Sequence, residues 1–277
     1  MSRPVTGGAG GAGGRTAGTP LLRLEGISKR FGAVQALQDV DFECDVGEVV
    51  ALVGDNGAGK STLVKAIAGT QPADSGRIFV DGREVHITSP QAAAELGIAT
   101  VYQDLALCDN LDVVANLYVG RERARGRALR GLAVLDEVAM EHEAQSLLER
   151  LSVRIPSVRT EVASLSGGQR QSIAVARATM GDPRVVILDE PTAALGVAQT
   201  AQVLDLVRRL RDEGHAVIVI SHNMVDVFAV ADRIVVLRLG RRVATFRVAE
   251  TTAEEVVAAI TGAGQEEVRS TFASEAS

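Results

Sequence analysis

A glycine-rich segment has the residue types and spacing that phosphate binding requires. Residues 54–61 match the pattern Gly-x-x-x-x-Gly-Lys-Ser. Glycines let backbone N–H groups turn toward phosphates, and a following helix adds partial positive charge. Lys60 is expected to reach the β- and γ-phosphates of a nucleotide, and the Ser61 hydroxyl to ligate Mg²⁺. The alternative is an ordinary glycine-rich turn. The candidate binding residues are Gly54, Asp55, Asn56, Gly57, Ala58, Gly59, Lys60, Ser61 and Thr62.

Two acidic residues follow a short run of Val, Ile and Leu. Residues 185–192 read Val-Val-Ile-Leu-Asp-Glu-Pro-Thr. Asp189, at a strand end, would hold the metal directly or through water. Glu190, close to the γ-phosphate, suits a general base that polarises the attacking water. The alternative is an acidic pair that caps the next helix, with Pro191 at its start.

Two polar residues end or follow other apolar runs. Gln103 follows residues 97–102, and its amide could contact Mg²⁺ or the attacking water; the alternative is a surface glutamine. His222 follows residues 216–220, where a neutral imidazole can donate to a γ-phosphate oxygen. A structural histidine is the alternative for His222. Three other histidines lack such a placement and are expected to be structural: His86, His142 and His215.

A third segment lies between these two halves of a nucleotide site. Residues 165–171 read Leu-Ser-Gly-Gly-Gln-Arg-Gln. Ser-Gly-Gly at the start of a helix over 169–180 would form another N-terminal anion site. The alternative is a helix cap by Ser166, and the two interpretations are compatible.

The apolar pattern predicts an α/β fold that positions these segments. Strand patterns occur at 21–27, 40–46, 48–53, 97–102, 184–188, 216–220 and 233–237. Helical patterns occur at 60–69, 198–212, 223–230 and 252–260. The alternation of short apolar runs with helices toward the C-terminus indicates a parallel sheet with crossover helices. Residues 104–181 have helical spacing and few strand signals, so we expect a mainly helical insertion.

Composition narrows the class of protein. The 277 residues are 46% hydrophobic and 23% charged, which is ordinary for one large or two small soluble domains. A net charge of −6 argues against nucleic-acid binding. No stretch approaches the roughly 18–20 apolar residues that span a bilayer. Cys44 and Cys108 lie far apart, which favours a reduced, cytoplasmic chain.

Three polar segments are expected to lie outside the packed core. Residues 1–20 contain seven glycines and no apolar run, which predicts a disordered tail rather than a signal peptide. Residues 263–277 form a polar C-terminal tail. Five arginines lie between Arg121 and Arg130, which predicts a solvated loop. The alternative for this stretch is contact with a membrane partner or anionic lipid.

The order of these motifs resembles the ATP-binding subunit of an ATP-binding-cassette (ABC) transporter over residues 21–262. The resemblance implies a P-loop NTPase core with a mainly parallel sheet, an antiparallel β subdomain and an inserted helical subdomain near 104–181. It implies ATP hydrolysis with ATP and Mg²⁺. The implied catalytic residues are Lys60, Gln103, Glu190 and His222, and the implied metal ligands are Ser61, Gln103 and Asp189.

In that family two subunits pair head to tail, and each ATP lies between the two copies. The resemblance implies that one copy's Ser166, Gly167, Gly168 and Gln169 contact the nucleotide bound to the other copy. It also implies that adenine stacks on Phe31, for which a core position is the alternative. The Gln103 region and the insertion would pass the closing and reopening of the two copies to a membrane permease.

Other segments resemble the monosaccharide-importer branch, namely residues 102–111, 116–122 and 193–197. A permease, and indirectly a sugar-binding protein, are then the implied partners, at the cytoplasmic face of the membrane. Gly196 stands where most members have an Asp that touches the opposite copy. The alternatives are a soluble cassette ATPase acting on nucleic acid or ribosomes, a subunit for another solute, and a regulatory subunit with little turnover.

Overall fold

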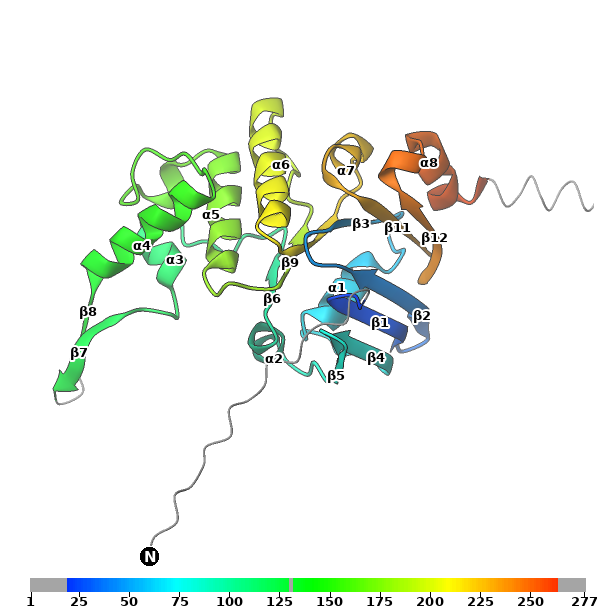
Figure 1. The fold of residues 1–277 in the computed structure, drawn as a ribbon, viewed down its shortest axis with the longest axis horizontal. Helices are drawn as coiled ribbons and strands as arrows, with labels where there is room; N and C mark the ends of the chain where they lie inside the picture. Colours follow the sequence, from blue (N-terminus) through cyan, green and yellow to red (C-terminus); the bar gives the residue numbers. More distant parts are fainter. Residues whose placement is uncertain (1–18, 130–131, 264–277) are drawn as a thin grey trace, which may run out of the picture.

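A computed structural model describes residues 19–129 and 132–263 of the chain (Figure 1). The expected tails, 1–20 and 263–277, lie almost entirely outside the described residues. No helix within the described part of the chain is long and apolar enough to cross a membrane.

A six-stranded sheet in the order β12-β11-β3-β10-β9-β6 forms the centre of the molecule. Five strands are parallel, and β12 pairs antiparallel with β11 at one edge. The bounds are β3 Val49–Val53, β6 Ile98–Val101, β9 Val185–Asp189, β10 Ala216–Ile220, β11 Arg233–Arg238 and β12 Arg241–Arg247. The continuous runs of Val, Ile and Leu are explained by burial of the inner strands on both faces.

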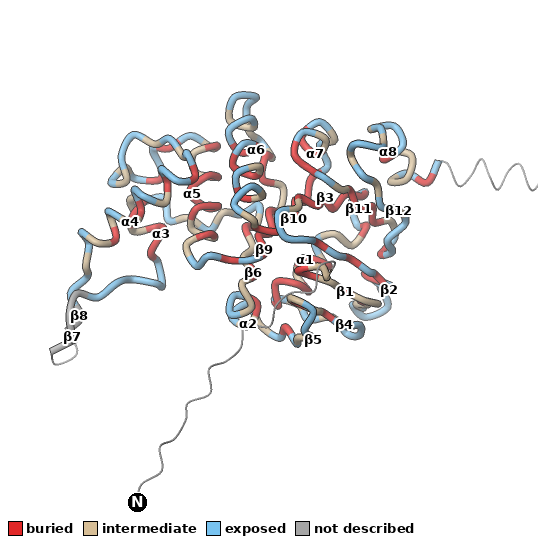
Figure 2. Tube along the Cα trace, in the orientation of Figure 1, coloured by how far each residue is buried: buried red, intermediate tan, exposed pale blue. Residues whose placement is uncertain are grey.

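Alternation along β3 divides the core into two layers. Val49, Ala51 and Val53 pack in one cluster, with residues of α5, α6, α7 and α8. Val50 and Leu52 pack in the other, with α1 and the antiparallel sheet. Figure 2 shows buried residues running through the sheet between exposed helix faces. The helices are α1 Lys60–Ile67, α5 Gly167–Thr179, α6 Val197–Asp212, α7 Met224–Val230 and α8 Ala253–Thr261.

A second sheet, in the order β2-β1-β4-β5, is antiparallel throughout. Its strands are β1 Leu22–Phe31, β2 Val34–Cys44, β4 Ser75–Val80 and β5 Arg83–Val85. The short helix α2 Pro90–Glu95 and the 3-10 turn Val248–Glu250 complete the core. The sequence patterns indicated β1 and β2 but not β4, β5 or β12. Exposed residues predominate in β5 and β12, which lie at sheet edges, and the apolar residues of β4 occupy only its second half.

The insertion contains α3 Val113–Tyr118, α4 Glu137–Arg150, the 3-10 turn Val162–Ser164 and α5. It also contains an antiparallel hairpin, β7 Ala124–Leu129 and β8 Leu132–Leu135, which projects from the helices (Figure 1). The expectation of a loop over Arg121–Arg130 is therefore wrong for β7. The charge of the arginines favours a loop, whereas backbone pairing with β8 determines the conformation.

Candidate active site

The glycine-rich segment joins the end of β3 to the start of α1, as expected for a phosphate loop. Gly54 and Gly59 have positive φ angles of 150° and 105°. A Cβ at Gly54 would collide with the Leu237 carbonyl oxygen, and one at Gly59 would lie 2.8 Å from the Ala36 oxygen. Both positions therefore require glycine. The N-terminus of α1 has no side-chain cap, which leaves its amides available to an anion.

Lys60 folds back over this loop. Its Nζ donates to the carbonyl oxygens of Gly54, at 2.7 Å, and Asp55, at 3.0 Å. Burial lowers the pKa of Lys60, while Glu190, Asp55 and Asp189 oppose that shift. The ammonium is thus held beside carboxylates by weak neutral acceptors that phosphate oxygens can replace.

Asp189 ends β9, and Glu190 follows it. Both lie at the end of the parallel strands from which the phosphate loop also leaves β3. The backbone N–H of Glu190 donates to the Ile220 oxygen at 2.9 Å, and Glu190 has a positive φ of 49°. Burial raises the pKa of Asp189, the Glu190 charge raises it further, and Lys60 opposes the change. A half-buried carboxylate whose ionised form is penalised in this way is suited to a bound cation.

The capping alternative for this acidic pair is wrong. The next helix, α6, begins only at Val197 and has Gly196 at its N-cap. Residues after Pro191 form turns, and Ala194 has a φ of 60°, so the chain cannot enter a helix at Pro191.

His222 contacts Glu190 directly. Its Nδ1 lies 2.9 Å from the Glu190 Oε1, with the histidine side chain 75% exposed and the glutamate side chain 17% exposed. A carboxylate only accepts, so Nδ1 carries the proton in this contact. This contact was not predicted, although β9 and β10 were both predicted and the two residues follow adjacent parallel strands. Another predicted assignment agrees with the structure: His215 is buried, with Nδ1 2.6 Å from the Pro183 oxygen.

Gln103 is exposed after β6 and lines a cavity of about 390 Å³ with Gly167 and Leu195. It therefore faces both the start of α5 and the loop after Glu190. No group of three or more His, Cys, Asp or Glu side chains in the described ranges could hold a metal by itself. Metal binding by Ser61, Gln103 and Asp189 therefore stays a prediction, in which phosphates would supply the other oxygen ligands that Mg²⁺ needs.

The Ser-Gly-Gly-Gln segment caps α5 in this subunit. Ser166 and Gln169 form a capping box, with Gln169 N–H to Ser166 Oγ at 3.3 Å and Ser166 N–H to Gln169 Oε1 at 3.0 Å. Gln169 also donates to the Arg154 oxygen at 3.0 Å, so its side chain is engaged within the subunit. Gly168 is buried, and a Cβ there would lie 2.8 Å from the Gln199 Cβ on α6.

The two halves of the predicted site do not meet in one chain. No hydrogen bond or ion pair in the described residues joins 166–169 to 54–62. Phe31 is 43% exposed at the end of β1, so the core alternative for it is wrong. The Lys29 ammonium lies 5.7 Å from the centre of the Phe31 ring.

Comparison with known proteins identifies a family. Residues 37–193 match the family model described as ABC transporter. A fructose import ATP-binding protein of Rhizobium meliloti is 45% identical over 88% of this chain and 95% of its own length. A xylose/arabinose import ATP-binding protein of Sulfolobus acidocaldarius is 43% identical over 87% and 94%. A ribose import ATP-binding protein of Burkholderia pseudomallei is 43% identical, and this chain covers 47% of its length.

Solved structures confirm the expected α/β P-loop fold. A nucleotide-free ATP-binding cassette from an ABC transporter aligns with a TM-score of 0.75 at 26% identity, over 88% of this chain and 96% of that one. An ATP-binding cassette in its ADP conformation aligns with a TM-score of 0.72 at 26% identity, over 88% and 95%.

The raised pKa of Asp189 generates a stability prediction. Because the ionised carboxylate is less favourable in the folded than in the unfolded chain, Asp189→Asn should increase the free energy of unfolding at neutral pH. The gain should shrink as the pH falls through the raised pKa toward the ordinary carboxyl range of about 4. Urea unfolding without nucleotide measures it at several pH values. Glu84→Gln, at an exposed position on β5, is the control. A gain that is independent of pH would contradict the assignment.

Proposed function

The chain belongs to the ABC transporter family, and on this premise we propose that it is the ATP-hydrolysing subunit of a monosaccharide importer. The observation that carries the ATPase proposal is the cluster of Lys60, Asp189, Glu190 and His222 at the carboxyl ends of the parallel strands. It combines a phosphate-binding cation, a metal-binding carboxylate and an oriented base. The sugar proposal is supported by relatives named for fructose and for xylose/arabinose import.

Nucleotide binding would use the groups that the phosphate loop leaves available. The N–H groups of Gly57, Gly59 and the first turn of α1 would donate to the phosphates, whereas those of Asn56 and Ala58 already bind Asp55. Lys60 would exchange its carbonyl partners for phosphate oxygens. The exposed ring of Phe31 offers a stacking face for adenine. Ser61, Asp189 and Gln103 would hold Mg²⁺, which neutralises charge on the phosphates.

Glu190 would polarise the attacking water, and His222 would orient Glu190. The 2.9 Å contact uses Nδ1–H of His222, which leaves Nε2 of a neutral ring as an acceptor. His222 therefore donates to a phosphate only after releasing Glu190 or as an imidazolium. Its exposure leaves the ring free to turn between these two positions.

A complete site would need a second copy. Ser166 caps the Gln169 N–H of the 13-residue helix α5, so the N–H groups of Gly167 and Gly168 would be left for an anion. This helix start meets no phosphate loop within the described chain. Head-to-tail pairing would place Ser166, Gly167 and Gly168 of one copy on the nucleotide of the other. Gly196 is exposed and has no side chain to contact the opposite copy, so we expect weaker coupling through that loop.

The partners follow from importer function. A membrane permease would receive the motion of the insertion, and a sugar-binding protein would deliver the solute to that permease. The subunit would then act at the cytoplasmic face of the membrane. The net charge of −6 and the names of the relatives favour this function over action on nucleic acid or ribosomes.

Glu190→Gln tests the base. The amide is isosteric but cannot accept a proton, so turnover should fall about 10²–10⁴-fold while ATP affinity is retained. Phosphate release gives the turnover, and a fluorescent ATP analogue gives the affinity. Glu84→Gln is the control and should hydrolyse ATP normally. Near-normal hydrolysis by Glu190→Gln would remove Glu190 from this role.

Mixed dimers test the shared site. Lys60→Ala and Ser166→Arg copies should each be inactive alone, because every site in either homodimer has one damaged half. In an equal mixture, half of randomly paired dimers keep one intact site of two, so about a quarter of the normal rate should return. Differently tagged copies verify pairing. Heterodimers that hydrolyse no ATP would contradict the trans arrangement.

Transport coupling tests the solute class. ATPase activity of the subunit with its permease in lipid vesicles should rise severalfold when a monosaccharide-loaded binding protein is added, because transport turnover consumes ATP. The sugar-free binding protein and a Glu190→Gln subunit are the controls. Stimulation only by a binding protein for another class of solute would refute the sugar assignment and leave the ATPase assignment intact.

A further inference from the structure

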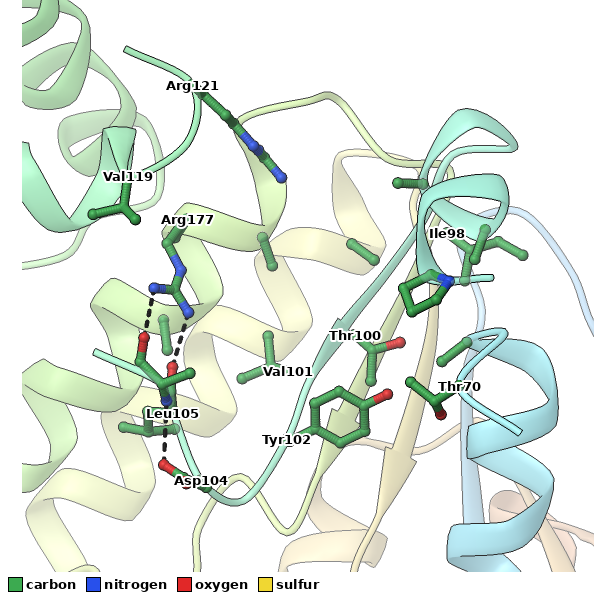
Figure 3. Close-up of a pocket in the computed structure, with 18 residues that line it drawn as sticks. Thr70, Ile98, Thr100, Val101, Tyr102, Asp104, Leu105, Val119, Arg121 and Arg177 are labelled. Carbon is green, nitrogen blue, oxygen red and sulfur yellow. Dashed lines mark hydrogen bonds between the residues drawn. The ribbon is translucent and has the colours of Figure 1, made fainter. Parts of the chain in front are cut away.

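The backbone that follows Gln103 is held by a single side chain from α5. Arg177 donates through Nη2 to the Leu105 oxygen at 2.9 Å and through Nη1 to the Ala106 oxygen at 2.8 Å. Figure 3 shows the guanidinium pointing from α5 onto these two carbonyls. Two adjacent carbonyls match the fork of a guanidinium, which a lysine cannot reproduce.

No other polar contact within the described ranges ties residues 103–107 to the rest of the protein. The remaining bond in this segment is local, from Ala106 N–H to Asp104 Oδ1 at 3.3 Å. The next anchor comes at Cys108, whose N–H and carbonyl bind the buried side chain of Asn116 at 2.7 and 2.9 Å.

Packing alone does not fix this segment. One cavity, of about 390 Å³, lies between Asp104–Ala106, Tyr102 and Arg121 (Figure 3). A second cavity of similar volume, about 390 Å³, lies between the segment and Gly167. Leu105 and Leu107 are only partly buried against the core. Pairing of β6 with β9 holds the chain before Gln103, and the two hydrogen bonds from Arg177 hold the chain after it, where there is space on both sides.

Burial of Arg177 in this contact destabilises its positive charge. It is half-buried, and burial and nearby Arg121 lower its pKa. No carboxylate in the described chain forms an ion pair with it. A half-buried guanidinium that binds only carbonyls is expensive to keep, which indicates a use other than charge pairing.

We propose that Arg177 is a positioning residue that makes the Gln103 segment and α5 move as one body. The proposal rests on the function proposed above. Ser166 starts α5 and would contact the nucleotide of the other copy, while Arg177 lies near the end of the same helix. Docking of α5 on the partner's nucleotide would then set the position of Gln103 in its own site.

A spin label on the segment tests the tie without relying on catalysis. Ala106→Cys with Cys108→Ser provides an exposed thiol for a nitroxide, and buried Cys44, whose pKa is raised by burial, stays unreactive. In this background Arg177→Met should shorten the rotational correlation time of the label at least about threefold, because the segment gains nanosecond freedom. Arg177→Gln, whose side chain is shorter, should change it in the same direction.

Kinetics test whether the tie matters for turnover. Without the label, Arg177→Met should lower kcat about tenfold or more, the value of losing charge-assisted hydrogen bonds, and leave affinity for an ATP analogue within about twofold. The matched control is Arg208→Met, because Arg208 on α6 also binds a backbone carbonyl, that of Ala229 at 3.0 Å. It should change neither label mobility nor kcat.

The outcomes separate the two proposals. Unchanged label mobility in Arg177→Met would show that Arg177 does not hold the Gln103 segment. A mobile segment together with a normal kcat would show that this hold is not needed for turnover. If Arg177→Met does not fold, Arg177→Gln supplies both measurements under the same criteria. A wild-type chain without ATPase activity would refute the proposed function and the coupling with it, while the label would still show whether Arg177 holds the segment.

Discussion

Parallel pairing among β3, β10, β9 and β6 is the constraint on which the site depends. Parallel strands end at the same edge, so the residues that follow them are brought together although they are far apart in the sequence. Register makes this specific: Asp189 is aligned with Ile220, and Glu190 binds the Ile220 oxygen. Apolar burial on both faces of the sheet holds that register. A slip would separate the carboxylates from Lys60 and His222.

The five parallel strands of the central sheet and the motifs that follow them were predictable because each is a local signal. Runs such as Val185–Asp189 show buried strands directly, and glycine spacing at 54–59 shows the loop. Starts and ends of helices were also close, as for α6 and α8. These features depend on neighbouring residues alone, so a single sequence contains enough information to place them.

The remaining features depend on contacts between distant residues. β12 and β5 are edge strands whose exposed polar side chains resemble those of loops. The Glu190–His222 contact needs the strand order, and the hold of Arg177 on Leu105 and Ala106 needs the packing of the insertion on the core. Such contacts are set by tertiary structure, and no local pattern contains them.

Gly168 packs at an interface within its subunit and, in the proposed dimer, would also lie at the interface with the second copy. Its missing side chain lets α5 approach Gln199 of α6 within its own subunit, while its backbone starts the helix that would face a second copy. The space that glycine provides is already filled from inside the subunit. Loss of activity after replacing this glycine would thus combine a displaced α6 with a damaged nucleotide contact. Ser166, exposed at the helix start, is the position at which those two effects come apart.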